Sequence, residues 1–330
     1  MAAQILVTRD IPQKGLDMLI DEGFDIKVRS SYEPFTYDEL SNEAQNFQYL
    51  LSTSKEKLDR KFLEANKHLK MISQFAAGFD NIDVEAATEL GIPIGHTPQA
   101  MNKATSDIAF GLTIAVMRNF FQMHKSIKEN KWGDFHPRAN LGQEPYGKIL
   151  GIFGLGAIGF EMARKCKYAY DMEIIYCNRS KNEKAEFELG AKKVSFDQLL
   201  ELSDVISVHC NLSEETFHKF DKTAFQKMKP SAVFINTSRG KVHHQEHLYE
   251  ALINKEIWGA GLDVTDPEPM KANDPLLDLP NVCVLPHVGS ATNEARNEMS
   301  RLAAENLIRF IKNGEITYCV NPSLLAAGKS

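Results

Sequence analysis

The stretch Ile149-Leu150-Gly151-Ile152-Phe153-Gly154-Leu155-Gly156-Ala157-Ile158-Gly159 decides the fold of this chain. Its apolar first half predicts a strand, and the residues after the glycines predict a helix over 157–169. In such a turn, the first glycine permits a tight bend, the second admits a pyrophosphate, and the third lets helix and strand pack closely. The helix N-terminus then faces the phosphates. The context therefore predicts a dinucleotide-binding turn formed by Gly154, Leu155, Gly156, Ala157, Ile158 and Gly159.

The end of the next expected strand, over 173–177, indicates which dinucleotide is bound. An NAD site usually has an acidic residue there, which accepts hydrogen bonds from the ribose hydroxyls. This chain has Asn178, Arg179 and Ser180 instead. Arginine and serine would bind a 2′-phosphate that a carboxylate would repel. We therefore expect these three residues to favour NADP(H), with NAD(H) as the alternative cofactor and a solvated loop as the alternative for Arg179.

The rest of the chain alternates short apolar strands with helices in two blocks, one over about 5–98 and one from Lys148 onward. This alternation predicts an α/β fold of mostly parallel sheets covered by helices on both faces. Between the blocks, 104–116 predicts an apolar helix, and Gly111 within it favours close packing against another helix. An aromatic and polar stretch over 132–146 is the longest irregular segment expected.

Composition narrows the class of protein. The 330 residues suit two domains, and a net charge of −6 argues against a nucleic-acid partner. No apolar run approaches the length of a membrane span, and the first residues lack the basic lead of a signal peptide, so we expect a cytoplasmic protein. The cysteines show no CxxC spacing and are expected to be free thiols: Cys166, Cys177, Cys210, Cys283 and Cys319.

Three further peptides follow apolar strands of the second block, and they contribute Arg239, Glu268 and His287. Ligands bind beyond the carboxyl ends of the strands in an open parallel sheet, so these groups are expected at one edge together with the cofactor. Arginine can hold a carboxylate through two hydrogen bonds, and histidine can transfer a proton near neutral pH. A glutamate beside that histidine favours its protonated form. The three residues therefore predict chemistry on a 2-oxo acid.

These peptides, together with the glycine turn, resemble the D-isomer-specific 2-hydroxyacid dehydrogenase family over nearly the whole chain. The matching segments are Asn236-Thr237-Ser238-Arg239-Gly240, Gly261-Leu262-Asp263-Val264-Thr265-Asp266-Pro267-Glu268-Pro269 and Pro286-His287-Val288-Gly289-Ser290-Ala291-Thr292. Within the family, the acid-free, arginine-bearing end of the second strand is similar to that of glyoxylate/hydroxypyruvate reductases. Reductases of 2-ketogluconate and other D-2-hydroxyacid dehydrogenases are the alternatives. Formate dehydrogenases have Gln where Glu268 stands, which argues for carbonyl reduction.

The resemblance implies a role for each matching residue. His287 would be the general acid, Glu268 would pair with it, and Arg239 would bind the substrate carboxylate and polarise the carbonyl. Backbone amides of Ala77 and Gly78 would hold the same carboxylate. Asp263 would contact the nicotinamide carboxamide. Further cofactor-lining residues would be Thr105, Cys210, Thr237 and Gly289.

The resemblance also implies an architecture of two Rossmann-like or flavodoxin-like doubly wound domains with a cleft between them. Residues 1–98, completed by 292–330, would form the substrate domain, and 99–291 the NAD(P)-binding domain. Closure about the two connections would exclude water. The expected reaction reduces glyoxylate to glycolate and hydroxypyruvate to D-glycerate, and a homodimer would form through 104–116 and the aromatic arm. Some family members instead act as dinucleotide-sensing co-repressor scaffolds, which is the alternative of another class.

One histidine-rich segment, His243-His244-Gln245-Glu246-His247, has helical spacing that could suit a metal. The proposed chemistry needs no metal, so the segment is interpreted as the polar start of a helix. No metal site is therefore predicted.

Overall fold

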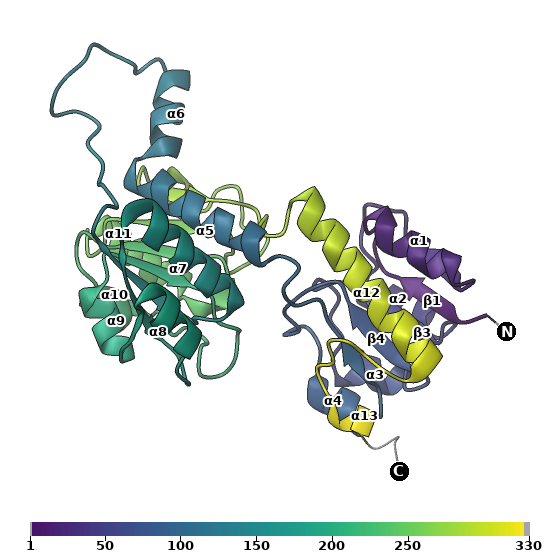
Figure 1. The fold of residues 1–330 in the computed structure, drawn as a ribbon. Coiled ribbons are helices and arrows are strands. Elements are labelled where there is room, and N and C mark those ends of the chain that lie inside the picture. Colours follow the sequence, from purple (N-terminus) through teal and green to yellow (C-terminus); the bar gives the residue numbers. More distant parts are fainter. Residues whose placement is uncertain (1, 327–330) are drawn as a thin grey trace. The chain divides into compact units, whose positions relative to one another are not determined.

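The computed structural model describes residues 2–326, and these divide into two compact units. Unit 1 comprises the residues up to 101 together with those from 290 onward, and unit 2 comprises residues 102–289 (Figure 1). These limits lie two or three residues from the domain limits expected from the sequence. The ends of the expected first domain, residue 1 and residues 327–330, lie outside the described residues.

The described part of unit 1 forms a five-stranded parallel sheet in the order β2-β1-β3-β4-β5. Its strands are β1 (Gln4–Val7), β2 (Asp25–Val28), β3 (Tyr49–Ser52), β4 (Met71–Gln74) and β5 (Ile94–Gly95). Its helices are α1 (Gln13–Asp21), α2 (Tyr37–Ala44), α3 (Arg60–Ala65), α4 (Val84–Glu89), α12 (Asn293–Asn313) and α13 (Ser323–Ala326). This strand order is that of the flavodoxin-like doubly wound fold.

Helix α12 lies beside α1 although nearly the whole chain separates them (Figure 1). A Cβ on Gly15 would collide with the Ser300 carbonyl oxygen, so only glycine allows this approach. The Ser300 hydroxyl donates to the Pro12 carbonyl at 2.6 Å and accepts from the Gly15 amide at 3.0 Å. Helix α12 also contributes Ala303, Ala304 and Leu307 to the core that β1 and β3 share.

The described part of unit 2 forms a seven-stranded parallel sheet in the order β12-β11-β10-β9-β6-β7-β8. Its strands are β6 (Ile149–Phe153), β7 (Glu173–Cys177), β8 (Lys192–Lys193), β9 (Val205–Val208), β10 (Val233–Asn236), β11 (Gly259–Leu262) and β12 (Val282–Val284). Its helices are α5 (Asn102–Met117), α6 (Phe120–Lys128), α7 (Ala157–Tyr170), α8 (Glu183–Leu189), α9 (Phe196–Leu202), α10 (Lys222–Lys227) and α11 (Gln245–Ile253), with 3-10 turns η1 (Gly240–Val242) and η2 (Pro275–Asp278). The two sheets confirm the expected doubly wound α/β fold.

Helix α5 packs across the sheet of unit 2. A Cβ on Gly261 in β11 would lie 3.0 Å from Leu112 Cβ, so the glycine lets helix and strand approach closely. The expected reason for Gly111 is wrong within the described chain, because a Cβ there would meet no atom within 4 Å. Gly111 lies on the exposed side of α5.

Helix α6 and the arm after it lie largely in solvent. The sequence did not predict α6, which has no buried residue in the described chain. The arm carries Trp132 and Phe135, with 80% and 91% of their surfaces exposed. In the part of the chain that the structure describes, no helix combines the length and apolar character needed to cross a membrane.

One histidine is part of the core of unit 2. His243 is fully buried, and its Nδ1 accepts a hydrogen bond of 3.0 Å from the Asn236 amide nitrogen. The amide oxygen of Asn236 accepts from the amide and hydroxyl of Ser238, so the side chain cannot turn over without losing those bonds. Protonation of Nδ1 would place an N–H donor of the ring opposite the N–H donor of Asn236. Burial, aided by the charges of His218 and His244, lowers the pKa of His243 to about 3.

The buried neutral His243 makes stability depend on pH. Between its folded pKa of about 3 and an unfolded value near 6.5, the unfolded chain binds the additional proton, so acid favours unfolding. The stabilising contribution of neutral His243 to the free energy of unfolding is complete above about pH 6.5. It is lost as pH falls, by at most about 1.4 kcal/mol per pH unit. Urea unfolding of the wild type and of His243→Leu from pH 7.5 to 5 should give a shallower pH dependence for the variant. Equal slopes would contradict this account.

Candidate active site

The carboxyl edge of the unit 2 sheet gathers the residues that the sequence singled out in this unit, except for Thr105, which α5 supplies. Strand β6 lies between β7 and β9 in the sheet, so the order in which successive strands are added reverses there, as at the ligand-binding switch point of doubly wound folds. Gly154 leaves β6 at this point with φ +95°. A Cβ on it would lie 2.6 Å from the Cys210 nitrogen after β9, so glycine closes the turn against the neighbouring strand.

The other glycines of the turn have the geometry that a dinucleotide requires. A Cβ on Gly159 would lie 2.7 Å from the Gly154 carbonyl oxygen, so helix α7 needs glycine to pack against the turn. A Cβ on Gly156 would meet no atom within 4 Å, which leaves open space in front of the helix N-terminus. The turn therefore fits a pyrophosphate group.

The end of β7 both braces this turn and presents cationic groups. The side chain of Asn178 accepts from the Leu155 amide at 2.6 Å and donates to the Leu155 carbonyl at 3.2 Å. Asn178 thus holds the glycine turn, whereas Arg179 and Ser180 are exposed.

Two lysines that the sequence analysis missed lie close to the end of β7. Lys193 donates to the Arg179 carbonyl at 2.9 Å, and its ammonium charge and that of Lys219 oppose the burial that raises the pKa of Cys177. Lys193 lies next to β7 because its strand, β8, pairs with β7, and no clear sequence signal marks this two-residue strand.

Two loops of the site pack backbone against backbone. Arg239 follows β10, and a Cβ on the next residue, Gly240, would collide with the Thr265 carbonyl oxygen. Thr265 in turn lies three residues before Glu268, and its hydroxyl donates to the Pro267 carbonyl at 2.8 Å. The guanidinium Nη1 of Arg239 donates to the Ser238 carbonyl at 2.8 Å. Glycine at position 240 therefore allows the loop that carries Arg239 and the loop that carries Glu268 to lie in contact.

His287 and Glu268 form a direct pair. The Nδ1 of His287 donates to Glu268 Oε1 at 2.6 Å, and both side chains are partly exposed. This bond places a proton on Nδ1 and leaves Nε2 as the atom that can exchange a proton with a ligand. The backbone of His287 has φ +54°, a conformation that non-glycine residues rarely adopt.

Asp263 holds the loop in which His287 sits. It is 1% exposed, and its two oxygens accept from the amides of Val288 and Gly289, each at 2.7 Å. Burial raises the pKa of Asp263, and these two hydrogen bonds oppose the rise. Asp263 was expected only to contact the cofactor, and its support of the loop that carries His287 was not predicted.

The remaining predicted cofactor residues lie around this edge. Thr105 on α5 donates to the Gly289 carbonyl at 3.2 Å. The hydroxyl of Thr237 is 3.5 Å from Nδ1 of His209, whose Nε2 is 2.8 Å from the Ser207 hydroxyl. Ala77 and Gly78 are in unit 1, in the loop after β4.

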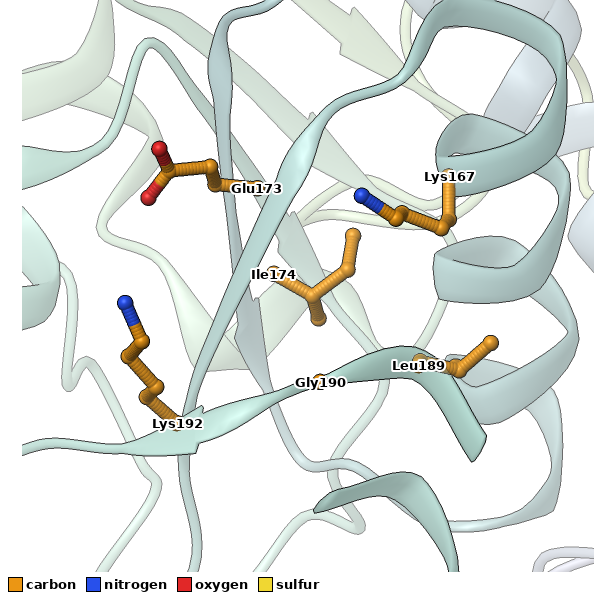
Figure 2. A pocket seen from close by; sticks show the side chains of 6 residues that line it. All are labelled: Lys167, Glu173, Ile174, Leu189, Gly190 and Lys192. Carbon is orange, nitrogen blue, oxygen red and sulfur yellow. The ribbon is translucent and has the colours of Figure 1, made fainter. Parts of the chain in front are cut away.

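Outside this edge, the structure offers no comparable candidate site among the described residues. Within residues 2–326, no group of three or more His, Cys, Asp or Glu side chains is arranged to hold a metal ion. The rings of His244 and His247 stack at 3.7 Å. A separate surface pocket lies at the amino end of β7, away from the glycine turn, and Figure 2 shows its lining: Lys167, Glu173, Ile174, Leu189, Gly190 and Lys192.

Known proteins are similar to this chain in sequence and in fold. Residues 110–289 match the family model described as D-isomer specific 2-hydroxyacid dehydrogenase, NAD binding domain. The chain is 40% identical to a glyoxylate reductase of Korarchaeum cryptofilum over 317 residues, which is 96% of this chain and 95% of that protein.

Two solved structures are also similar along the whole chain. A glyoxylate reductase from Paecilomyces thermophila is 34% identical with a TM-score of 0.87, covering 98% of this chain and 99% of that one. An NADPH-dependent glyoxylate/hydroxypyruvate reductase from Sinorhizobium meliloti, solved with NADP and malonate, is 28% identical with a TM-score of 0.84 and covers 97% of each chain. The chain therefore belongs to the D-isomer specific 2-hydroxyacid dehydrogenase family.

Proposed function

We propose that this protein is an NADPH-preferring reductase that converts glyoxylate to glycolate and hydroxypyruvate to D-glycerate. The observation that carries the proposal is the 2.6 Å hydrogen bond between His287 Nδ1 and Glu268 Oε1, on a loop held by Asp263. A histidine oriented in this way by a carboxylate can protonate a carbonyl oxygen as hydride reaches the carbonyl carbon. The relatives named as glyoxylate reductases support this substrate class.

Residues of this chain would donate the proton and bind the substrate carboxylate in this reaction. When bound, the reduced nicotinamide supplies a hydride, and His287 Nε2 supplies the proton that completes the alcohol. The carboxylate of Glu268 stabilises the imidazolium before the transfer. Arg239 in unit 2 binds the substrate carboxylate, as do the Ala77 and Gly78 amides of unit 1.

The preference for NADPH rests on the end of β7. Asn178 stands where an acidic residue would accept from the ribose of NAD, and its amide is engaged with Leu155. Arg179 and Ser180 are exposed beside it, and Lys193 and Lys219 add positive charge. This charge suits a 2′-phosphate. The relative solved with NADP is described as NADPH-dependent, which supports the same preference.

The direct test is NADPH oxidation, followed at 340 nm, with a panel of glyoxylate, hydroxypyruvate, pyruvate and 2-ketogluconate. We expect the highest kcat/KM with glyoxylate and hydroxypyruvate. Highest turnover of 2-ketogluconate would favour the alternative reductase, and binding of NADPH without turnover of any of the four would favour the scaffold alternative. The homodimer and the cytoplasmic location stay predictions.

Removal of the general acid His287 should lower turnover strongly and leave the affinity for NADPH unchanged. His287→Ala is expected to lower kcat by roughly 10²- to 10⁴-fold, because the carbonyl oxygen loses its proton donor. NADPH affinity, measured by fluorescence titration, should stay unchanged. His247→Ala is the matched control, since His247 is another partly buried histidine of unit 2, and it should retain wild-type kcat. Wild-type turnover by His287→Ala would refute the assigned role.

Cofactor selectivity should change at the end of β7. Arg179→Ala is expected to lower the NADPH/NADH ratio of kcat/KM by at least about tenfold, because the 2′-phosphate loses a charge-assisted hydrogen bond. Lys193→Ala should lower the ratio less. Lys192→Ala is the control. Lys192 is adjacent to Lys193 in the sequence, but its side chain lines the pocket of Figure 2, at the other end of β7. An unchanged ratio in Arg179→Ala would remove the basis for NADPH preference.

A further inference from the structure

The loop after β4 has three successive carbonyl groups, each held by a hydrogen bond from within unit 1. The Ala76 carbonyl accepts from the Thr97 amide at 2.9 Å. The Ala77 carbonyl accepts from Nδ1 of the His96 ring at 2.9 Å. The Gly78 carbonyl accepts from the Gln74 amide nitrogen at 2.8 Å.

A held carbonyl also fixes the next amide. The peptide group is planar and trans, so the C=O of one residue and the N–H of the following residue point in opposite directions. The three bonds therefore direct the amides of Ala77, Gly78 and Phe79 away from Thr97, His96 and Gln74. No hydrogen bond within the described chain uses any of these three amides as donor. Backbone amides that no other group uses are available as donors to an anion such as a carboxylate.

We propose that His96 is a positioning residue, which orients the Gly78 amide toward the substrate carboxylate through its hydrogen bond to the Ala77 carbonyl. This inference rests on the proposed function, in which the Ala77 and Gly78 amides bind that carboxylate. His96 does not touch the substrate in this scheme. Its effect passes through one peptide group.

The structure restrains His96 on several sides. Its backbone amide donates to the Tyr318 carbonyl at 3.0 Å, and its carbonyl accepts from the Asn306 side chain at 2.9 Å. Its ring meets the Phe79 ring edge-on, with centroids 5.5 Å apart. Because a carbonyl can only accept, the bond to Ala77 places a proton on Nδ1. Burial lowers the pKa of His96, so the ring is neutral at neutral pH and adds no charge to the loop.

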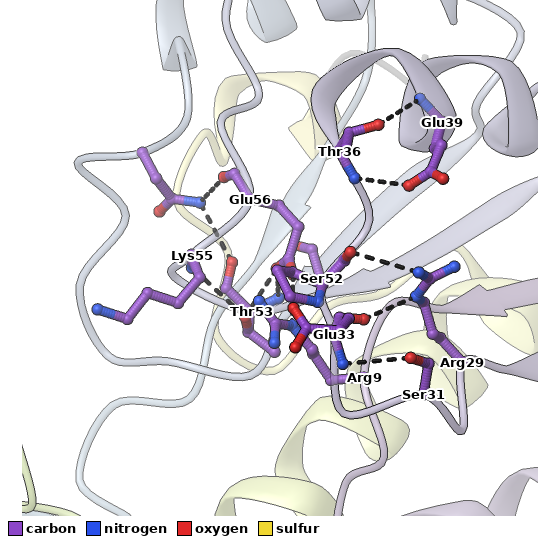
Figure 3. Close-up of polar contacts among 12 residues, drawn as sticks. Arg9, Arg29, Ser31, Glu33, Thr36, Glu39, Ser52, Thr53, Lys55 and Glu56 are labelled. Atoms are coloured by element: carbon purple, nitrogen blue, oxygen red, sulfur yellow. Dashed lines mark hydrogen bonds and ion pairs between the residues drawn. The ribbon is translucent and has the colours of Figure 1, made fainter. Parts of the chain in front are cut away.

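A second set of contacts holds the far side of the same loop. The Gln74 amide nitrogen also donates to Asn81 Oδ1 at 2.7 Å, and Asn81 donates to the Glu56 carbonyl at 2.7 Å. The buried carboxylate of Glu56 accepts from Arg9 at 3.0 Å and from Thr53 (Figure 3). The loop is thus braced independently of His96. Loss of His96 is expected to release one peptide group and leave the fold of unit 1 in place.

The test compares variants that keep or lose the donor at the Nδ1 position. In His96→Asn, the side-chain nitrogen occupies nearly the place of Nδ1. In His96→Gln it reaches the place of Nε2, and in His96→Leu it is absent. His68→Leu is the matched control, because His68 is another histidine of unit 1 that contacts a backbone carbonyl. It is exposed, and its Nε2 lies 3.2 Å from the Ala44 carbonyl in a different part of the unit.

We expect His96→Leu and His96→Gln to raise the KM for glyoxylate about tenfold, as for the loss of one well-aligned hydrogen bond. The kcat and the KM for NADPH should stay within about twofold of wild type, since only uniform substrate binding is weakened. His96→Asn should restore the KM to within about threefold, and His68→Leu should match wild type. An unchanged KM in His96→Gln, or an equal loss in His96→Asn, would overturn the proposal. If His96→Leu does not fold, the comparison of His96→Asn with His96→Gln still tests the role of His96.

A binding experiment separates this inference from the proposed activity. Oxalate, a dicarboxylate analogue of a 2-oxo acid, is titrated into isotope-labelled protein with NADPH, and the Gly78 amide signal is followed by NMR. We expect the signal to shift at about tenfold lower oxalate in the wild type and His96→Asn than in His96→Gln. Equal midpoints, or no shift of Gly78, would overturn the role of His96. If the wild type does not reduce glyoxylate, the proposed function fails, and this titration still tests His96.

Discussion

The buried carboxylate of Asp263 sets the geometry on which the reactive edge of unit 2 depends. Asp263 directly follows β11, a strand in the interior of the sheet, and its carboxylate accepts from two consecutive amides of the loop after β12. Those bonds offset the cost of a buried charge and of the positive φ at His287. The histidine is thereby presented to Glu268 by a rigid strand end. An exposed or protonated carboxylate at this position could not fix the loop as firmly.

The same side chain type serves three purposes in this chain, and the environment selects among them. His287 has a carboxylate as the partner of its Nδ1, which suits proton transfer through Nε2. His243 has an amide donor as its partner and no solvent, which keeps it neutral. His96 has a backbone carbonyl as its partner, which makes it a fixed donor. Sequence position alone does not distinguish these cases, because each partner comes from a different segment.

Much of the architecture and the edge at which the site lies could be predicted from the sequence, because both depend on local patterns. A strand that ends in Gly154-Leu155-Gly156 and the apolar runs before Arg239 and His287 are contiguous signals. Helix α6 was not predicted, although Phe120, Met123 and Ile127 recur at helical spacing. This apolar face covers no core, because α6 buries no residue in the described chain. Asn178 stays a predicted cofactor residue. Its hydrogen bond to Leu155 was not predicted, because the two residues lie far apart in the sequence. Lys193 and His96 each make a single contact to a backbone carbonyl, for which no sequence motif exists.

The discontinuity of unit 1 has a consequence for the order in which the chain acquires structure on the ribosome. Unit 2 is contiguous, so all of its strands have been made once residue 289 has emerged. The sheet of unit 1 lacks α12 at that moment. The core that Ile5, Val7 and Leu51 share with α1 is then missing the side chains that α12 supplies. Domains tend to fold as they leave the ribosome, yet here the first hundred residues must wait for nearly the last forty. The N-terminal segment is therefore the part of the nascent protein with the longest exposure to chaperones and to aggregation.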